Sequence, residues 1–217
     1  MHATTGLRAP GFALMGLLVG AATDTQAQVH AYITHAADVA SDTPNGLGVL
    51  TVAFAEAEIA ALHAGLAVED LTNLDGMRRH AGHTLHALDP AIGGVGPGLG
   101  YGVKHGAAGA AFDIEFAAGS DGASQNVTFH ARHIDATLGN VVQWTDEAIA
   151  LAQRVQSSPT AADAAPLVSR LDDLCRAILR GRDTDRDRLV GWRTGEGGLA
   201  QATQHMNLLK RGEGLSR

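Results

Sequence analysis

The fold is decided by the segment 124–156, which reads SQNVTFHARHIDATLGNVVQWTDEAIALAQRVQ. With a rotation of about 100° per residue, its apolar side chains fall on one stripe of a helix. They are Ile134, Val141, Trp144, Ala148, Leu151 and Val155. The opposite face carries charged and amide side chains, as a face in water should. The segment therefore predicts one long amphipathic helix.

The same periodicity covers most of the remaining chain, and no segment alternates as a β-strand would. Helices are predicted at 47–68, 73–88, 101–118, 124–156, 163–181 and 199–210, with breaks at clusters of Gly and Pro. Short connections between helices of these lengths favour antiparallel neighbours. We therefore predict an all-α fold, namely an antiparallel up-and-down four-helix bundle with two additional C-terminal helices.

The N-terminal residues have the pattern of an export signal. Arg8 precedes an apolar stretch at 11–22 that is too short to span a bilayer, and Thr25-Gln26-Ala27 suits a signal peptidase. We predict a signal peptide at 1–27 and a single domain at 28–217. The mature protein is then expected to be periplasmic or secreted, with no membrane span after signal cleavage.

Composition excludes several classes of partner and cofactor. The net charge of -7, with scattered Lys and Arg, argues against a nucleic-acid partner. Cys175 is the only cysteine, so a disulfide within the chain and thiolate clusters are excluded. The 11 histidines are the anomaly, at about twice ordinary usage.

Helical geometry predicts which histidines point inward. His130 and His133 lie on the apolar arc of 124–156, and His63 shares the apolar face of 47–68 with Glu56. His105 aligns with an apolar row on 101–118 that contains Phe112 and Phe116, so both His63 and His105 are expected to be buried.

The helix at 73–88 is less regular. His80 lies at the edge of its apolar stripe, His83 lies further round, and His86 is expected in solvent. Four helices thus each direct at least one histidine toward, or beside, the same interior.

Several buried imidazoles need partners, because each unpaired one costs about 1–3 kcal/mol. A metal ion would supply them, and helical bundles build such sites from facing helices. The predicted ligands are His63, His80, His83, His105, His130 and His133, with Glu56 as an accessory ligand or hydrogen-bond acceptor. Cu, Zn, Ni and Fe all remain open. The sequence therefore predicts an exported metal-binding protein for storage, delivery or sensing.

Two alternatives use the same histidines. Haem b held by two of them would make a redox protein or enzyme, whereas c-type attachment is excluded because Cys-x-x-Cys-His is missing. Hydrogen-bonded core histidines would instead make a structural or interaction module. No hydrolytic Ser/His/Asp arrangement can be assigned, so enzyme activity and any protein partner stay open.

The loop 183–196 resembles a degenerate EF-hand. Asp183, Asp185 and Asp187 stand at positions one, three and five, but Arg188 replaces the glycine of position six. Glu196 comes two residues after the position of the usual bidentate glutamate. The loop is interpreted either as a weak calcium site made by these four carboxylates or as a solvated turn.

The Gly-rich loop at 92–100 lacks the Gly-Lys-Ser/Thr ending of a phosphate-binding P-loop. We interpret it as a flexible helix-to-helix connection.

Overall fold

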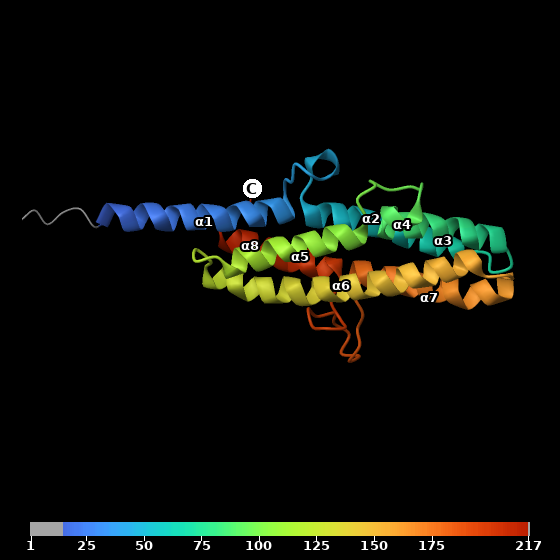
Figure 1. The fold of residues 1–217 in the computed structure, drawn as a ribbon. Helices are drawn as coiled ribbons and strands as arrows, with labels where there is room; N and C mark the ends of the chain where they lie inside the picture. The colour runs from blue at the N-terminus through green and yellow to red at the C-terminus, as the bar shows by residue number, and fades with distance from the viewer. Residues whose placement is uncertain (1–14, 217) are drawn as a thin grey trace, which may run out of the picture.

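The computed structural model describes residues 15–216, with side chains described from residue 25 onward, and this part of the chain is all helical (Figure 1). The elements are α1 (Met15–Ala37), the short 3-10 helix η1 (Pro44–Gly46), α2 (Val49–Ala67), α3 (Leu74–Leu88), α4 (Pro90–Gly93), α5 (Val103–Gly119), α6 (Gln125–Ser157), α7 (Ala161–Arg180) and α8 (Leu199–Gly212). Residues 1–14 of the predicted signal peptide lie outside the described residues.

Local sequence explains where several helices begin. The side chains of Asn73, Ser124 and Thr160 each accept a hydrogen bond from a backbone N–H in the first turn of α3, α6 and α7. Asp89 caps α4 in the same way, directly before Pro90. The six predicted helices agree with α2, α3, α5, α6, α7 and α8 to within about two residues at each end. The helix α1, which runs through the predicted cleavage point after Ala27, and the short α4 were not predicted.

Alanine and glycine allow the helices to approach closely. The buried face of α2 is lined by Ala53, Ala57, Ala60 and Ala64, and α2 packs against α3, α5 and α7. A Cβ added at Gly106 of α5 would lie 2.8 Å from the Cβ of Ala53. Larger side chains fill the rest of the core, and those from α6 and α7 include Ile134, Leu138, Leu171, Leu174 and Ile178.

The orientation of α5 differs from the prediction. Phe112 and Phe116 are 55% and 46% exposed, and His105 is exposed with them. The buried face instead carries Val103, Gly106, Ala107, Ala110, Asp113, Ile114 and Ala117. The helix has two apolar stripes, and the one with small side chains faces inward because only small residues fit the short distance to α2.

The length and composition of α2 would also allow it to cross a membrane. Its apolar window is 44% buried within the protein, and it carries the fully buried carboxylate of Glu56. These features are those of a core helix.

Candidate metal centres

Two separate clusters of three histidines lie on different pairs of helices. The first, here the α2–α3 site, consists of His63 on α2 with His80 and His83 on α3. The second, the α6–α8 site, consists of His130 and His133 on α6 with His205 on α8. Each site thus combines a His-x-x-His pair on one helix with a single histidine from its neighbour.

The nitrogens of each cluster have the spacing of ligands around one ion. Nδ1 of His63 lies 3.2 Å from Nδ1 of His80 and 3.4 Å from Nδ1 of His83. Metal–nitrogen bonds of about 2.0 Å in tetrahedral geometry place neighbouring ligand atoms about 3.3 Å apart. In the α2–α3 site the three nitrogens can therefore reach a single ion.

The α6–α8 site repeats this geometry. Nδ1 of His205 lies 3.1 Å from Nδ1 of His130 and 3.2 Å from Nδ1 of His133. The three ligand atoms of each cluster lie within 4.8 Å of one another. Two unrelated pairs of helices therefore arrive at the same arrangement of nitrogens.

Hydrogen bonds among three neutral imidazoles cannot pair all of the Nδ1 atoms that face one another. A neutral ring has one N–H and one lone pair, so a given Nδ1 either donates one hydrogen bond or accepts through a single lone pair. His63 and His205 each present one Nδ1 to two others. A cation would bind all three lone pairs, with the protons on the outer Nε2 atoms.

The pKa values of His63, His80, His130, His133 and His205 are lowered, which favours the neutral form that binds metals. Burial, followed by the neighbouring His83 and His80, lowers the pKa of His63, and burial also lowers the pKa of His80. Burial lowers the pKa of His130 and His133, and it lowers that of His205 to about 4, with His133 and His130 adding to the effect.

The two sites differ in their surroundings. In the α6–α8 site, Trp192 stacks on His133 with ring centroids 3.8 Å apart, and Phe129 packs edge-on against both His130 and His133. At the α2–α3 site His80 borders a small cavity of about 170 Å³. The α6–α8 site is therefore the more enclosed by aromatic rings.

The sites are too far apart to share an ion. Gln156, at the end of α6, donates a hydrogen bond to the carbonyl of Arg78 on α3 and so marks the level of the α2–α3 site. Along α6, at about 1.5 Å per residue, His133 lies about 35 Å from Gln156. Figure 1 shows α3 and α8 toward opposite ends of the long helix. The sequence predicted that histidines from four helices would meet in one interior. The structure has two separate sites instead.

His105 joins neither cluster. It is exposed on α5, where its ring meets the edge of Tyr101 at a centroid distance of 4.6 Å. His86, expected in solvent, is half-buried because Gly93 and Gly96 pack against it.

Glu56 holds the Gly-rich loop instead of joining the histidines. Its Oε1 accepts hydrogen bonds from the backbone nitrogens of Leu99, Tyr101 and Gly102 at 3.1, 2.9 and 3.1 Å. Gly98, with φ of +143°, leaves room for the other oxygen, since a Cβ there would lie 2.5 Å from Oε2. The carboxylate therefore binds the backbone of the loop that directly precedes α5.

The two histidines on α1 that the structure describes, His30 and His35, have carboxylate partners. Nδ1 of His35 lies 2.7 Å from Asp113 and its Nε2 lies 3.1 Å from Asp42, and the hydrogen bond to Asp113 is the main reason that the pKa of His35 is raised. Nε2 of His30 lies 3.4 Å from Glu213. The six clustered histidines differ in that their Nδ1 atoms face other imidazoles.

His205 was absent from the predicted ligands, although a signal for it exists. The buried residues of α8 are Leu199, Ala202, Met206 and Leu209. His205 lies three residues after Ala202 and four before Leu209, so it borders the same face. The helical rotation that predicts which face is buried therefore also places His205 beside the buried face of α8.

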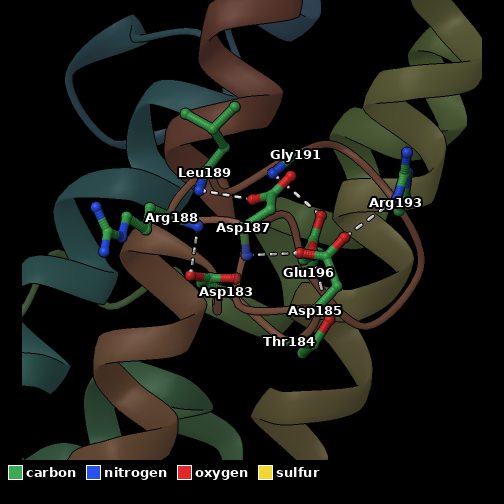
Figure 2. Close-up of polar contacts among 9 residues, drawn as sticks. All are labelled: Asp183, Thr184, Asp185, Asp187, Arg188, Leu189, Gly191, Arg193 and Glu196. Carbon is green, nitrogen blue, oxygen red and sulfur yellow. Dashed lines mark hydrogen bonds and ion pairs between the residues drawn. The ribbon is translucent and has the colours of Figure 1, made fainter.

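The acidic loop between α7 and α8 gathers its three aspartates (Figure 2). The carboxylates of Asp183, Asp185 and Asp187 lie within 4.8 Å of one another, and all three are exposed. Asp183 accepts a hydrogen bond from the backbone nitrogen of Arg188, whose φ of 72° provides the turn that glycine makes at position six of an EF-hand. The loop therefore turns at the expected place.

The side chain of Glu196 forms hydrogen bonds within that loop. It is 4% exposed, and its Oε2 accepts a hydrogen bond from the backbone nitrogen of Gly191 at 3.1 Å. Its Oε1 lies 3.4 Å from the hydroxyl of Thr184. Figure 2 shows it bonded there, and it is not part of the group formed by the three aspartates.

Comparison with known protein families, with curated proteins and with solved structures finds no match for this chain.

Proposed function

We propose that this chain is an exported protein that binds two transition-metal ions, one at the α2–α3 site and one at the α6–α8 site, for storage, delivery or sensing. The observation that carries the proposal is that one Nδ1 in each cluster, that of His63 or His205, lies 3.1 to 3.4 Å from the Nδ1 atoms of the two other histidines. These distances match the edges of a tetrahedron around one ion.

The ligand set favours Cu(II), Zn, Ni or Fe. Imidazole nitrogen suits these ions, whereas Mg²⁺ and Ca²⁺ prefer oxygen ligands. The clusters consist of histidines alone, and three protein ligands leave a fourth tetrahedral position for water or a transferred ligand. An open position suits an ion that is exchanged as well as one that is stored.

Elemental analysis of tag-free protein tests the proposal. After incubation with Zn²⁺ or Cu²⁺ and removal of free ion, the expected content is two ions per chain, falling to one in His63→Ala and one in His205→Ala. His105→Ala is the matched control, because it removes an exposed histidine outside both sites and should leave two. A stoichiometry near zero, or one that His205→Ala leaves unchanged, would contradict the proposal.

Haem b is the less favoured cofactor. Two axial histidines lie on opposite sides of the iron, with nitrogens about 4 Å apart and a flat porphyrin between them. The clustered Nδ1 atoms are closer and come in threes. A Soret band in the purified protein would favour haem over a bare ion.

The alternative of a structural or interaction module predicts a different response. If the imidazoles serve only as core residues, replacing both His130 and His133 with alanine lowers stability and changes no metal content. Loss of one ion from that double variant excludes this alternative.

A weak calcium site in the loop 183–196 is a second candidate function. It is supported by the convergence of Asp183, Asp185 and Asp187 and by the EF-hand-like turn at Arg188. Calorimetric titration with Ca²⁺ should give a dissociation constant at the weak end of the range, about 10⁻⁴ to 10⁻³ M. The signal should disappear in Asp185→Asn, and no heat from the parent protein would exclude the site.

Export and the detailed topology belong to the same proposal. Cleavage after Ala27 would leave Val29, Ile33 and Ala36 of α1 in the core, and Gln26 to Gln28 are exposed. Mass spectrometry of protein from the periplasm or medium should find Gln28 as the first residue. The up-and-down four-helix arrangement is supported by the packing of α2 on α3 and of α5 on α6, whereas α3 and α5, which are also consecutive in it, have few contacts with each other.

A further inference from the structure

The strongest asymmetry between the two histidine sites is the indole of Trp192. It comes from the loop between α7 and α8, and its ring lies nearly parallel to that of His133, with 19° between the planes. His133 is only 8% exposed, while Trp192 is 40% exposed. The indole thus lies over the imidazole on the solvent side of the site.

The ring of His133 is constrained on more than one side. Trp192 covers its face, and Phe129 meets it edge-on at a centroid distance of 4.6 Å. Its Nδ1 faces Nδ1 of His205 at 3.2 Å. Since the direction of Nδ1 depends on the rotation of the ring, the aromatic contacts fix the orientation in which this nitrogen serves as a ligand.

Hydrogen bonds fix the backbone on both sides of Trp192 in the sequence. The side-chain nitrogen of Asn140 donates hydrogen bonds to the carbonyls of Arg193 and Gly197, at 2.9 and 3.0 Å. On the other side, the backbone nitrogen of Gly191 donates to Glu196 at 3.1 Å. Asn140 and Glu196 are 3% and 4% exposed, so these anchors are shielded from competing water.

Asn140, which binds the loop backbone, and the proposed ligand His133 lie on the same face of α6. His133, Thr137 and Asn140 follow one another at intervals of four and three residues, and all three are buried. A Cβ at Gly197 would lie 2.2 Å from Cγ2 of Thr137, so the loop backbone rests directly on this face. One rigid helix therefore positions both the ligand His133 and the loop that covers it.

The α2–α3 site has a different environment. The ring contacts described for His63, His80 and His83 are with one another. That site therefore provides an internal reference, since a change at Trp192 should leave it unaffected.

From these contacts we infer that Trp192 is a positioning residue for the α6–α8 site, where it holds His133 in its metal-binding orientation and makes affinity there depend on the loop between α7 and α8. This role rests on the proposed function, because it requires an ion at that site. Side chains that orient a metal ligand typically contribute about 10- to 100-fold to metal affinity.

The test measures each site separately in the full-length, tag-free chain. The His63→Ala background leaves the α6–α8 site, and the His205→Ala background leaves the α2–α3 site. Competition with a chromophoric chelator then gives the dissociation constant for Zn²⁺ in each background, with and without Trp192→Ala. We expect Trp192→Ala to weaken binding about 10-fold at the α6–α8 site and to leave the α2–α3 site unchanged.

Two further measurements separate positioning from general destabilisation. Trp192→Phe retains an aromatic ring and should restore most of the affinity lost in Trp192→Ala. In a Trp144→Phe background Trp192 is the only tryptophan, and Cu²⁺ bound at the α6–α8 site should quench its fluorescence. His205→Ala should abolish that quenching, whereas His63→Ala should preserve it.

These measurements distinguish a failure of the proposed function from a failure of the role of Trp192. A parent chain that binds no ion overturns the proposed function together with this role. A parent that binds two ions, with equal affinity at the α6–α8 site before and after Trp192→Ala, overturns the role of Trp192 alone. Equal weakening of both sites by Trp192→Ala also overturns it, because it indicates a loss of folding.

Discussion

Nδ1 of His205 lies 3.1 Å from Nδ1 of His130, although 75 residues separate them in the sequence. The contact joins α8 to the start of α6, and two like groups at this distance cannot both be protonated without repulsion. Together with burial, this proximity lowers the pKa of His205 to about 4. The α6–α8 site is therefore deprotonated at neutral pH before any ion arrives.

Metal binding at this site should tolerate mild acid. A lowered pKa means that protons compete for the imidazole lone pairs only when the pH falls below the ordinary histidine value of about 6.5. In His63→Ala protein loaded with one Zn²⁺, we expect retention through pH 6.5 and release as the pH falls further toward 4. Dialysis at stepped pH followed by elemental analysis measures this. Half-release above pH 6.5 would contradict the lowered pKa values of His130, His133 and His205.

The metal-free protein should lose stability over the same interval. In the unfolded chain His205 has its ordinary pKa of about 6.5, so between that value and about 4 the unfolded state binds more protons than the folded state. The free energy of unfolding therefore decreases as the pH falls from 6.5 toward 4. His205→Asn removes this titration and should give a shallower decrease, measured by urea unfolding at several pH values. His35, whose pKa is raised, contributes with the opposite sign and is common to both proteins.

Glu56 should matter for stability and not for metal content. Replacing it with alanine leaves the backbone nitrogens of Leu99, Tyr101 and Gly102 without their shared acceptor. We expect a loss of about 3 kcal/mol in the free energy of unfolding, with two ions per chain retained if the variant is folded. Glu58→Ala, an exposed change on the same helix, is the control and should alter stability by less than about 0.5 kcal/mol. Loss of one ion in Glu56→Ala would mean that the carboxylate is a ligand after all.

Two glycine-to-alanine changes should have opposite effects. Gly139 is exposed in the middle of α6, and a Cβ there would meet nothing within 4 Å. Gly139→Ala should therefore stabilise the protein by about 1 kcal/mol. At Gly106 the added Cβ would lie 2.8 Å from that of Ala53, so Gly106→Ala should destabilise by about 1–3 kcal/mol. Thermal unfolding of both variants checks the pair, and stabilisation by Gly106→Ala would refute the close packing of α2 on α5.

The helices were predictable because period and breaks are local properties of the sequence. The apolar stripe of α6 and the Gly and Pro clusters between the helices gave boundaries that agree with the structure to within about two residues. The face of α5 was not predictable from periodicity, since it has two apolar stripes and only the distance to its neighbour decides between them. Phe112 and Phe116 are exposed for that reason.

Most of the clustered histidines were predicted, but their division into two sites was not. Five of the six predicted histidine ligands, all except His105, lie in the two clusters. Helical periodicity predicts the direction of each side chain around its own helix, but not its position along a neighbouring helix. The division into two sites depends on that axial position, which places His83 and His133 at different levels of α6. Glu56 points inward as predicted, and its partners proved to be the backbone of the Gly-rich loop.

Anomalous X-ray scattering from a crystal of the zinc-loaded protein, recorded at the zinc edge, shows whether each histidine cluster binds one ion. We expect two peaks per chain, one about 2.0 Å from the Nδ1 atoms of His63, His80 and His83, and one at the same distance from those of His130, His133 and His205. A single peak shared by other residues, or zinc found only on exposed side chains such as His105, would contradict the proposed function.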